Sequence, residues 1–240
     1  MKNVLEFKLD YCECDKHAVF PAIILAAGSA TRMQGVDKNF FELAGMPVII
    51  RTVKAFAESE HIGDIVVVTR EDRIAELESL LQQYGLSDNT IVVKGGSNRE
   101  ESALFGINAL DNKYEKVIIH DGARPFVDNQ IISRVCIALE TNDSVSCGVK
   151  EKSTIKVINR DWLVTQALVR DNLVSLQTPQ GVAVKPFIES ARVNDLSKFT
   201  DDTSVVEAVG VQTQVVEGSY KNMKVTTPED IKLAELYLQN

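Results

Sequence analysis

The amino-acid sequence predicts an α/β fold built on an open, mostly parallel β-sheet. After Phe20, short runs rich in β-branched residues alternate with helical patterns along the chain. These runs are apolar throughout, which is typical of strands buried on both faces of a parallel sheet. Strand–helix alternation favours right-handed crossovers, and ligands of such sheets bind at the carboxyl ends of the strands. The predicted strands span residues 22–25, 65–69, 91–93, 117–120 and 145–149.

The segments between these strands have recognisable helix starts. Pro47 suits the first position of a helix over 48–57, and Asp128 suits the N-cap of a helix over 129–140. Thr227 and Pro228 fit the cap and first turn of a C-terminal helix. Further predicted elements are helices over 71–83, through Ser102 to near Leu110, over 186–193 and over 202–209, and a strand at 214–217.

One segment departs from the strand–helix pattern. Residues 154–158 and 162–168 alternate in polarity around a polar turn, which predicts a β-hairpin and an arm projecting from the sheet over about residues 150–172. We expect residues 20–240 to form a single domain, preceded by an extension over 1–19 without a clear period. Cys12-Glu13-Cys14 in this extension leaves two interpretations open, a metal or redox site and a plain extension.

Length, composition and charge exclude several classes of protein. The chain has 240 residues, of which 45% are hydrophobic and 25% charged, as in an ordinary globular domain. Its net charge of −8 disfavours non-specific binding to nucleic acid, so an anionic ligand requires a local basic pocket. The four cysteines lack zinc-like spacing, and no apolar stretch is long enough to span a membrane. We therefore expect a cytoplasmic protein with reduced thiols and with neither nucleic-acid nor membrane partners.

The first candidate site lies directly after the first predicted strand. Residues 25–33 read Leu-Ala-Ala-Gly-Ser-Ala-Thr-Arg-Met, and Lys38 follows. Small residues let backbone amides approach a phosphate chain, while Arg32 and Lys38 supply the charge that a triphosphate needs. The loop matches neither the P-loop pattern nor the dinucleotide fingerprint, which disfavours P-loop hydrolysis and hydride transfer. A strand-to-helix turn with two surface cations is the alternative interpretation.

Two further loops follow later strands. Residues 95–97 and Ser102 can approach and hydrogen-bond a flat base, although a plain turn fits the same residues. Asp121 suits a Mg²⁺ ion shared with phosphates, and the alternative is a salt bridge to Arg124 that pins the loop. We interpret His120 as a buried core histidine. Because the loops follow strands of one sheet, we expect them to converge on one site.

Together these motifs resemble the polyol-phosphate cytidylyltransferases, and among them the 2-C-methyl-D-erythritol 4-phosphate cytidylyltransferases of the non-mevalonate isoprenoid pathway. The resemblance covers residues 20–240, and the motifs occur in the family's order. It implies a Rossmann-like nucleotidyltransferase sheet with a dimerising β-hairpin arm. It also implies that CTP and a polyol phosphate react to a CDP-polyol and pyrophosphate, in a homodimer whose active sites are shared between subunits.

The resemblance assigns roles residue by residue. CTP would be bound by residues of the first two loops, Ala26, Ala27, Gly28, Gly96, Ser97 and Ser102. The catalytic cations at the phosphates would be Arg32, Lys38 and Lys224, and Asp121 would hold Mg²⁺. The acceptor would be contacted by Arg124, Thr154, Arg170 and Thr200, with Thr154 and Arg170 reaching over from the arm of the other subunit.

The sequence departs from the family pattern at several places. The family usually has Gly where Ala30 stands and Ala where Gly122 stands. Asp37-Lys38-Asn39 stands where the family has a Pro-Lys-Gln run, and the loop is one residue shorter. The arm has a longer stretch, Glu151-Lys152-Ser153, before Thr154. The choice of acceptor depends partly on this arm.

Two other functions fit the same motifs. One is a ribitol 5-phosphate cytidylyltransferase of teichoic acid synthesis, although Ala26-Ala27 and Gly122-Ala123-Arg124 are closer to the methylerythritol enzymes. The other is a nucleotide-binding module without catalysis. A silent scaffold has no physical need for several cations around one carboxylate, which argues against this alternative. The residues concerned are Arg32, Lys38, Asp121 and Lys224.

Overall fold

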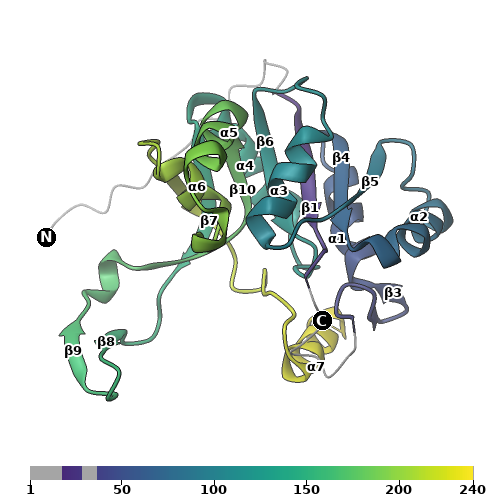
Figure 1. The fold of residues 1–240 in the computed structure, drawn as a ribbon. Coiled ribbons are helices and arrows are strands. Elements are labelled where there is room, and N and C mark those ends of the chain that lie inside the picture. The colour runs from purple at the N-terminus through teal and green to yellow at the C-terminus, as the bar shows by residue number, and fades with distance from the viewer. Residues whose placement is uncertain (1–17, 29–36, 240) are drawn as a thin grey trace, which may run out of the picture.

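The computed structural model describes residues 18–28 and 37–239. A seven-stranded sheet runs through the molecule in the order β11-β7-β10-β6-β1-β4-β5 (Figure 1). β10 is antiparallel to its neighbours β6 and β7, and the other pairs are parallel. The predicted mostly parallel α/β sheet is confirmed. Its strands are β1 (Phe20–Leu25), β4 (Ile62–Thr69), β5 (Thr90–Lys94), β6 (Lys116–Asp121), β7 (Ser144–Lys150), β10 (Val174–Ala183) and β11 (Gln214–Glu217).

The central strands are apolar on both sides because helices cover both faces of the sheet. In β1, Ala22 and Ile24 belong to one buried cluster, whereas Ile23 and Leu25 belong to the other. Each fully buried isoleucine of this kind contributes about 1.5–3 kcal/mol through removal of apolar surface from water. The first face packs on α1 (Val48–Ala57), α2 (Ile74–Gln83) and α4 (Asn129–Thr141). The second packs on α3 (Arg99–Asn108), α5 (Val184–Val193) and α6 (Asp202–Glu207).

Two local predictions differ from the structure. The sequence pattern predicts no strand at β10, because Pro179 and Gly181 of this segment are unfavourable in a strand. Pro179 is tolerated because it lies in the irregular stretch between Leu176 and Gln180, where the register with β7 shifts. Pro47 is the N-cap of α1 and not its first residue. It pairs instead with Glu42 in a short ribbon formed by β2 (Glu42–Leu43) and β3 (Met46–Pro47).

The predicted hairpin is present and projects away from the sheet (Figure 1). β8 (Lys156–Ile158) pairs antiparallel with β9 (Val164–Ala167), and every residue of both strands is exposed. The turn carries Trp162, which is 83% exposed. A short 3₁₀ helix, η3 (Arg170–Asn172), leads back toward β10. At the root of the arm, the Tyr220 hydroxyl donates to the Lys150 carbonyl at 2.7 Å.

The C-terminal helix α7 (Pro228–Gln239) begins as predicted. The Thr227 hydroxyl accepts the N–H of Asp230 at 3.3 Å, and the Asp230 carboxylate accepts the N–H of Thr227 at 2.8 Å. The helix packs on Val225, so it fixes the segment just before it. Two more 3₁₀ turns, η2 (Glu71–Arg73) and η4 (Leu196–Lys198), precede α2 and α6. In the described part of the chain, no helix has the length and apolar character needed to cross a membrane.

Candidate active site

The carboxyl ends of β1, β4, β5 and β6 lie along one edge of the sheet because these strands are parallel. Leu25, the last residue of β1, is in register with Asp121, the last residue of β6. Just beyond them, the N–H of Gly122 donates to the Leu25 carbonyl at 2.8 Å, and the N–H of Ala26 donates to the Val68 carbonyl at 2.7 Å. The loops that follow these strands therefore start side by side.

Close packing brings the first two candidate loops together. A Cβ atom at Gly95 would lie 2.4 Å from Cβ of Ala27 and 3.0 Å from Oγ of Ser102, so glycine is required there. Ala26 is buried, Ala27 half-buried and Gly28 exposed, so the chain rises out of the sheet toward solvent. The two loops thus meet at the sheet edge.

The second loop is held in shape by its own helix. The Ser102 hydroxyl accepts the N–H of Gly96 at 3.0 Å and donates to the Asn98 carbonyl at 2.8 Å. The Glu101 carboxylate accepts the N–H of Ser97 at 2.6 Å and also the Ser97 hydroxyl, which lowers the pKa of Glu101. Asn98 caps α3 by accepting the N–H of Glu101 at 2.8 Å. Gly96 and Ser97 are therefore preorganised next to Gly95, which packs against Ala27.

Asp121 is the centre of a charged cluster at this edge. Its Oδ1 accepts from Nε of Arg99 at 3.1 Å, and its Oδ2 lies 2.8 Å from Nζ of Lys224 and 3.4 Å from Nε of Arg124. Burial by itself would raise the pKa of Asp121, but the charges of Arg99, Lys224 and Arg124 outweigh burial and hold that pKa well below its usual range. Asp121 is therefore ionised at any physiological pH. The salt bridge to Arg124 that sequence reasoning offered as an alternative is also present.

Arg99 and Asp202 extend this cluster, although neither is among the predicted site residues. Nη2 of Arg99 donates to Oδ2 of Asp202 at 2.7 Å. Asp202 is fully buried, and its backbone N–H donates to Oε1 of Gln180 at 2.9 Å. Full burial raises the pKa of Asp202, and the charge of Arg99 opposes that shift. Arg99 thus binds both Asp121 at the end of β6 and Asp202 at the start of α6.

His120 and Thr178 form a buried hydrogen-bond network that holds the backbone of Asp121. The Thr178 hydroxyl accepts the N–H of Asp121 at 3.0 Å and lies 3.0 Å from Nδ1 of His120, while Nε2 of His120 lies 3.3 Å from the Arg124 carbonyl. A neutral imidazole with its proton on Nε2 satisfies all of these contacts, since Thr178 then donates to Nδ1. Burial lowers the pKa of His120 to about 3, with the charge of Asp121 opposing the shift. The prediction of a satisfied core histidine is confirmed.

Lys224 is placed by the segment before α7. The N–H of Val225 donates to the Ala123 carbonyl at 2.8 Å, and Nη1 of Arg124 donates to the Asn222 carbonyl at 2.9 Å. Asn222 is fully buried and donates from Nδ2 to the Thr178 carbonyl at 2.8 Å. These contacts hold Lys224, whose side chain is 34% exposed, against Asp121.

Four other predicted site residues are not part of the cluster that the structure shows around Asp121. They are Arg32, Thr154, Arg170 and Thr200. Arg32 lies outside the described residues, as does Cys12-Glu13-Cys14. Thr154 and Arg170 are exposed on the arm, which projects away from the body that carries the cluster (Figure 1). Thr200 is exposed just before α6. The structure therefore brings together the first two loops, Asp121, Arg124 and Lys224, but not the arm residues.

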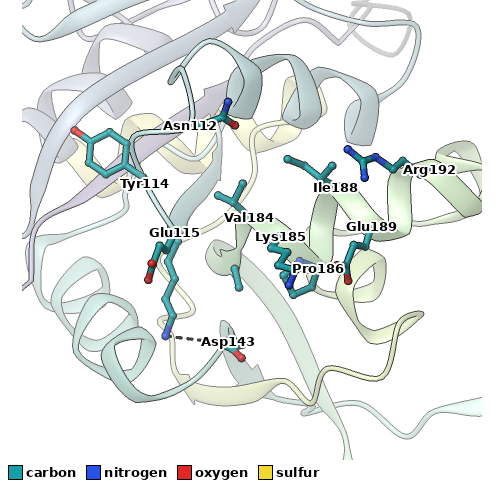
Figure 2. Close-up of a pocket in the computed structure, with 12 residues that line it drawn as sticks. Asn112, Tyr114, Glu115, Asp143, Val184, Lys185, Pro186, Ile188, Glu189 and Arg192 are labelled. Atoms are coloured by element: carbon teal, nitrogen blue, oxygen red, sulfur yellow. Dashed lines mark ion pairs between the residues drawn. The ribbon is translucent and has the colours of Figure 1, made fainter.

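A separate pocket of about 630 Å³ opens at the start of β6 and of α5, at the other end of β6 from Asp121 (Figure 2). Lys116 in this pocket is paired with Asp143 at 3.4 Å and donates to the Leu139 carbonyl at 2.8 Å, so it caps the C-terminus of α4. The lining mixes both signs of charge, and no predicted site residue belongs to it. The pocket is distinct from the cluster around Asp121.

The metal prediction concerns Asp121. Among residues 18–28 and 37–239, no group of three or more His, Cys, Asp or Glu side chains is arranged to hold a metal ion. Mg²⁺ commonly takes one or two protein carboxylates and completes its shell with phosphate oxygens and water. The single Asp121 carboxylate, at a partly open edge lined by cations, fits an ion of this kind that arrives with a nucleotide.

Four residues of the cluster are not among the site residues predicted from the sequence, which carries only weak signals for them. They are Arg99, Asp202, Thr178 and Gln180. Arg99 lies between Ser97 and Ser102 of the second loop, and Asp202 lies two residues after the predicted Thr200. The two partners are, however, 103 positions apart in the sequence. Thr178 and Gln180 belong to β10, which sequence reasoning did not assign as a strand. Only the strand order shows that these residues surround Asp121.

An edge where small-residue loops meet an ionised carboxylate and several cations can orient and neutralise nucleotide phosphates. With this mostly parallel sheet, such an edge defines a nucleotidyltransferase. The family model IspD, 2-C-methyl-D-erythritol 4-phosphate cytidylyltransferase, matches residues 20–240, and the chain belongs to this family of enzymes.

Individual relatives agree with the family match. The 2-C-methyl-D-erythritol 4-phosphate cytidylyltransferase of Clostridium novyi is 41% identical over 223 residues, which cover 91% of this chain and 96% of that protein. The enzyme of the same name from Bacillus cytotoxicus is 38% identical over 223 residues, covering 92% of this chain and 98% of that protein. The crystal structure of 4-diphosphocytidyl-2C-methyl-D-erythritol synthase from Anaerococcus prevotii is 32% identical and covers 93% of this chain and 97% of its own, with a TM-score of 0.83. The resemblance drawn from the motifs is confirmed.

Proposed function

We propose that this protein transfers CMP from CTP to 2-C-methyl-D-erythritol 4-phosphate, giving CDP-methylerythritol and pyrophosphate. Family membership supports the reaction, and the observation that carries it in this chain is the Asp121 carboxylate surrounded by Arg99, Arg124 and Lys224. An oxygen of the acceptor phosphate attacks the α-phosphorus of CTP, the bond from that phosphorus to the bridging oxygen breaks, and pyrophosphate leaves. No covalent enzyme intermediate is needed, so catalysis consists of orientation and charge neutralisation.

The CTP site in this proposal is the junction of the first two loops. Gly95 packs against Ala27, and the loop after it is preorganised by Ser102 and Glu101. Backbone groups of small residues can approach a base closely and read its hydrogen-bonding edge. The proposed contacts are Ala26, Ala27, Gly28, Gly96, Ser97 and Ser102.

Arg32, Lys38 and Lys224 are the proposed catalytic cations. The negative charge that grows on the phosphate oxygens in the transition state is stabilised by fixed cations, which need no reorganisation during the reaction. Lys224 pairs with Asp121 at 2.8 Å and is 34% exposed, so its ammonium group is already held beside Asp121 and open to a phosphate that binds there. Mg²⁺, held by Asp121 and the nucleotide, would neutralise further phosphate charge.

The acceptor site in this proposal needs two subunits. Thr154 and Arg170 would contact the acceptor from the arm of the other copy, and Arg124 and Thr200 from the body. The exposed apolar side chains of the arm, including Trp162 at 83% and Leu163 at 63%, favour coverage by another protein surface. We therefore propose a homodimer with shared active sites.

The proposal also covers the organisation of the chain. Residues 20–240 would act as one domain with the arm at about 150–172, and residues 1–19 would form an extension. The family model begins at residue 20, which is consistent with this division. We expect the enzyme to work in the cytoplasm.

The test is pyrophosphate release from CTP and Mg²⁺ with 2-C-methyl-D-erythritol 4-phosphate, in parallel with D-ribitol 5-phosphate and with no acceptor. We expect release with the methylerythritol acceptor alone. Release only with ribitol phosphate would show that the protein is instead a ribitol 5-phosphate cytidylyltransferase. CTP binding without release from any acceptor would favour a silent nucleotide-binding module.

A further inference from the structure

Asp37 is the residue immediately before Lys38 and is held by two arginines. Its side chain is 6% exposed, and its Oδ2 accepts from Nη1 of Arg70 at 3.0 Å and lies 3.7 Å from Nε of Arg73. A surface ion pair contributes little because water and salt screen it. Here the carboxylate is buried and the arginine side chains are only 28% and 32% exposed, so the screening is much weaker.

Arg70 and Arg73 both come from the connection between β4 and α2, which starts at the carboxyl edge of the sheet. The Arg73 guanidinium also lies over the Phe40 ring, 5.1 Å from its centroid. The turn over residues 37–40 is therefore held by this connection at both ends, through an ion pair at Asp37 and a cation–π contact at Phe40.

Asn39 holds the other side of Lys38. Its backbone N–H donates to Oδ1 of Asp37 at 3.2 Å, and its Nδ2 donates to the Ala26 carbonyl at 3.0 Å. Its own carbonyl accepts the N–H of Ile49 in the first turn of α1 at 2.8 Å. The residues before and after Lys38 are thus tied to the β4–α2 connection, to the residue after β1 and to the first turn of α1, which leaves the Lys38 backbone little freedom.

We propose that Asp37, Arg70 and Arg73 form an ion-pair clamp that positions Lys38 for the transfer reaction. Asp37 is a positioning residue in this inference, because it acts through Lys38 and touches no substrate itself. The inference rests on the proposed function, in which Lys38 stabilises the reacting phosphates. A lysine whose backbone is fixed loses less conformational freedom when it meets a phosphate, and small displacements of such a group reduce the rate strongly.

The experiment compares variants of the clamp with a matched control. Asp37→Ala removes the carboxylate, and Arg70→Met removes its closest cation. Arg70→Lys keeps a charge at that place. Asp72→Asn is the control, because Asp72 is the other partner of Arg70, at 3.0 Å from Nε, and is 66% exposed. The measurements are kcat and KM for CTP in pyrophosphate release, with CTP binding by calorimetry and thermal unfolding for each variant.

We expect Asp37→Ala and Arg70→Met to lower kcat by ~10- to 100-fold while KM for CTP changes much less, as for a misplaced catalytic group. Arg70→Lys should recover part of the loss, and Asp72→Asn should match the wild type. The decisive comparison uses the Lys38→Ala background. There Asp37→Ala should have no additional effect, because the residue that it positions is absent.

Wild-type kcat in Asp37→Ala would overturn the clamp while leaving the proposed function intact. A loss that is equally large with and without Lys38 would also overturn it, since a general structural role would act independently of that lysine. If the wild-type protein neither binds CTP nor releases pyrophosphate, the proposed function fails first, and the clamp fails with it. If Asp37→Ala unfolds, Arg70→Met provides the same comparison, because Asp37 then keeps Arg73.

Discussion

Nη2 of Arg99 donates a 2.7 Å hydrogen bond to Oδ2 of Asp202, a carboxylate with no exposed surface. The same guanidinium donates from Nε to Oδ1 of Asp121 at 3.1 Å. Arg99 thus joins the start of α3, the end of β6 and the start of α6. The first turn of α3, which shapes the second loop of the proposed cytosine site, is thereby tied to the carboxylate at the proposed reaction centre.

Arg99→Met should destabilise the protein. Removing one partner of a buried ion pair leaves an uncompensated charge and typically costs about 3–5 kcal/mol of unfolding free energy. The double variant Arg99→Met/Asp202→Asn removes the buried charge as well, so it should recover much of the stability but not the activity, because Asp121 still lacks Arg99. Urea unfolding and pyrophosphate release measure the two effects separately. Wild-type stability in Arg99→Met would contradict this account.

Lys224→Ala should be folded and nearly inactive. Loss of one preorganised donor to the developing phosphate charge typically lowers the rate by ~10² to 10³. The Lys224 side chain is partly exposed, so its removal leaves no cavity in the core. Lys221→Ala is the matched control, because Lys221 is exposed on the same segment and has no role in the proposed site. If Lys224→Ala is as active as Lys221→Ala and the wild type, Lys224 is not a catalytic residue.

His120 should make stability depend on pH. Burial holds the His120 pKa at about 3 in the folded state against the usual 6.5, so only the unfolded chain takes up this proton between these values. The unfolded state then binds more protons, and stability falls as pH decreases below about 6.5, by about 2 kcal/mol at pH 5 for this group alone. Urea unfolding at pH 7 and pH 5 without divalent cations, for the wild type and His120→Gln, measures the difference. An equal loss in both proteins would exclude His120 as its source.

The thiols of Cys136 and Cys147 should not react in the folded protein. Both are buried, and burial raises the pKa of each to about 12, so almost no thiolate exists at neutral pH. Iodoacetamide at pH 7.5, followed by peptide mass spectrometry, should label neither position without denaturant and both in urea. Rapid labelling of either thiol in the native protein would show that its side of the sheet opens.

Mixing two inactive variants tests the shared active site. Arg170→Ala lacks the proposed arm contact, and Lys224→Ala lacks the proposed catalytic lysine. In a heterodimer of the two, one site combines an intact body with an intact arm, so random exchange should restore roughly a quarter of the wild-type activity for a two-fold dimer. Sedimentation of the wild type and of Trp162→Ser checks the dimer directly. Failure to regain activity after verified subunit exchange would argue for sites built from one chain.

The central strands and their loops could be predicted from the sequence because burial leaves a local signature. Strands covered on both faces, such as Ile65–Val68, must be apolar at every position. The alternating polarity of residues 154–158 and 162–168 predicts a hairpin, and in the structure both of its strands are exposed. Small residues after β1 and the aspartate that ends β6 mark the ligand edge for the same reason, since parallel strands end together. These local patterns were sufficient for the fold class and for the family.

The partners of Asp121 and Asp37 were decided only by the tertiary structure. Arg99 meets Asp202 because β10 lies between β6 and β7 and its Gln180 binds the start of α6, and no local period encodes that strand order. Arg70 reaches Asp37 because β4 lies beside β1. An ion pair depends on where two side chains lie in space, whereas a sequence pattern reports only the periodic burial of neighbouring residues. The chemistry that surrounds the predicted residues therefore appears only when the strands are assembled.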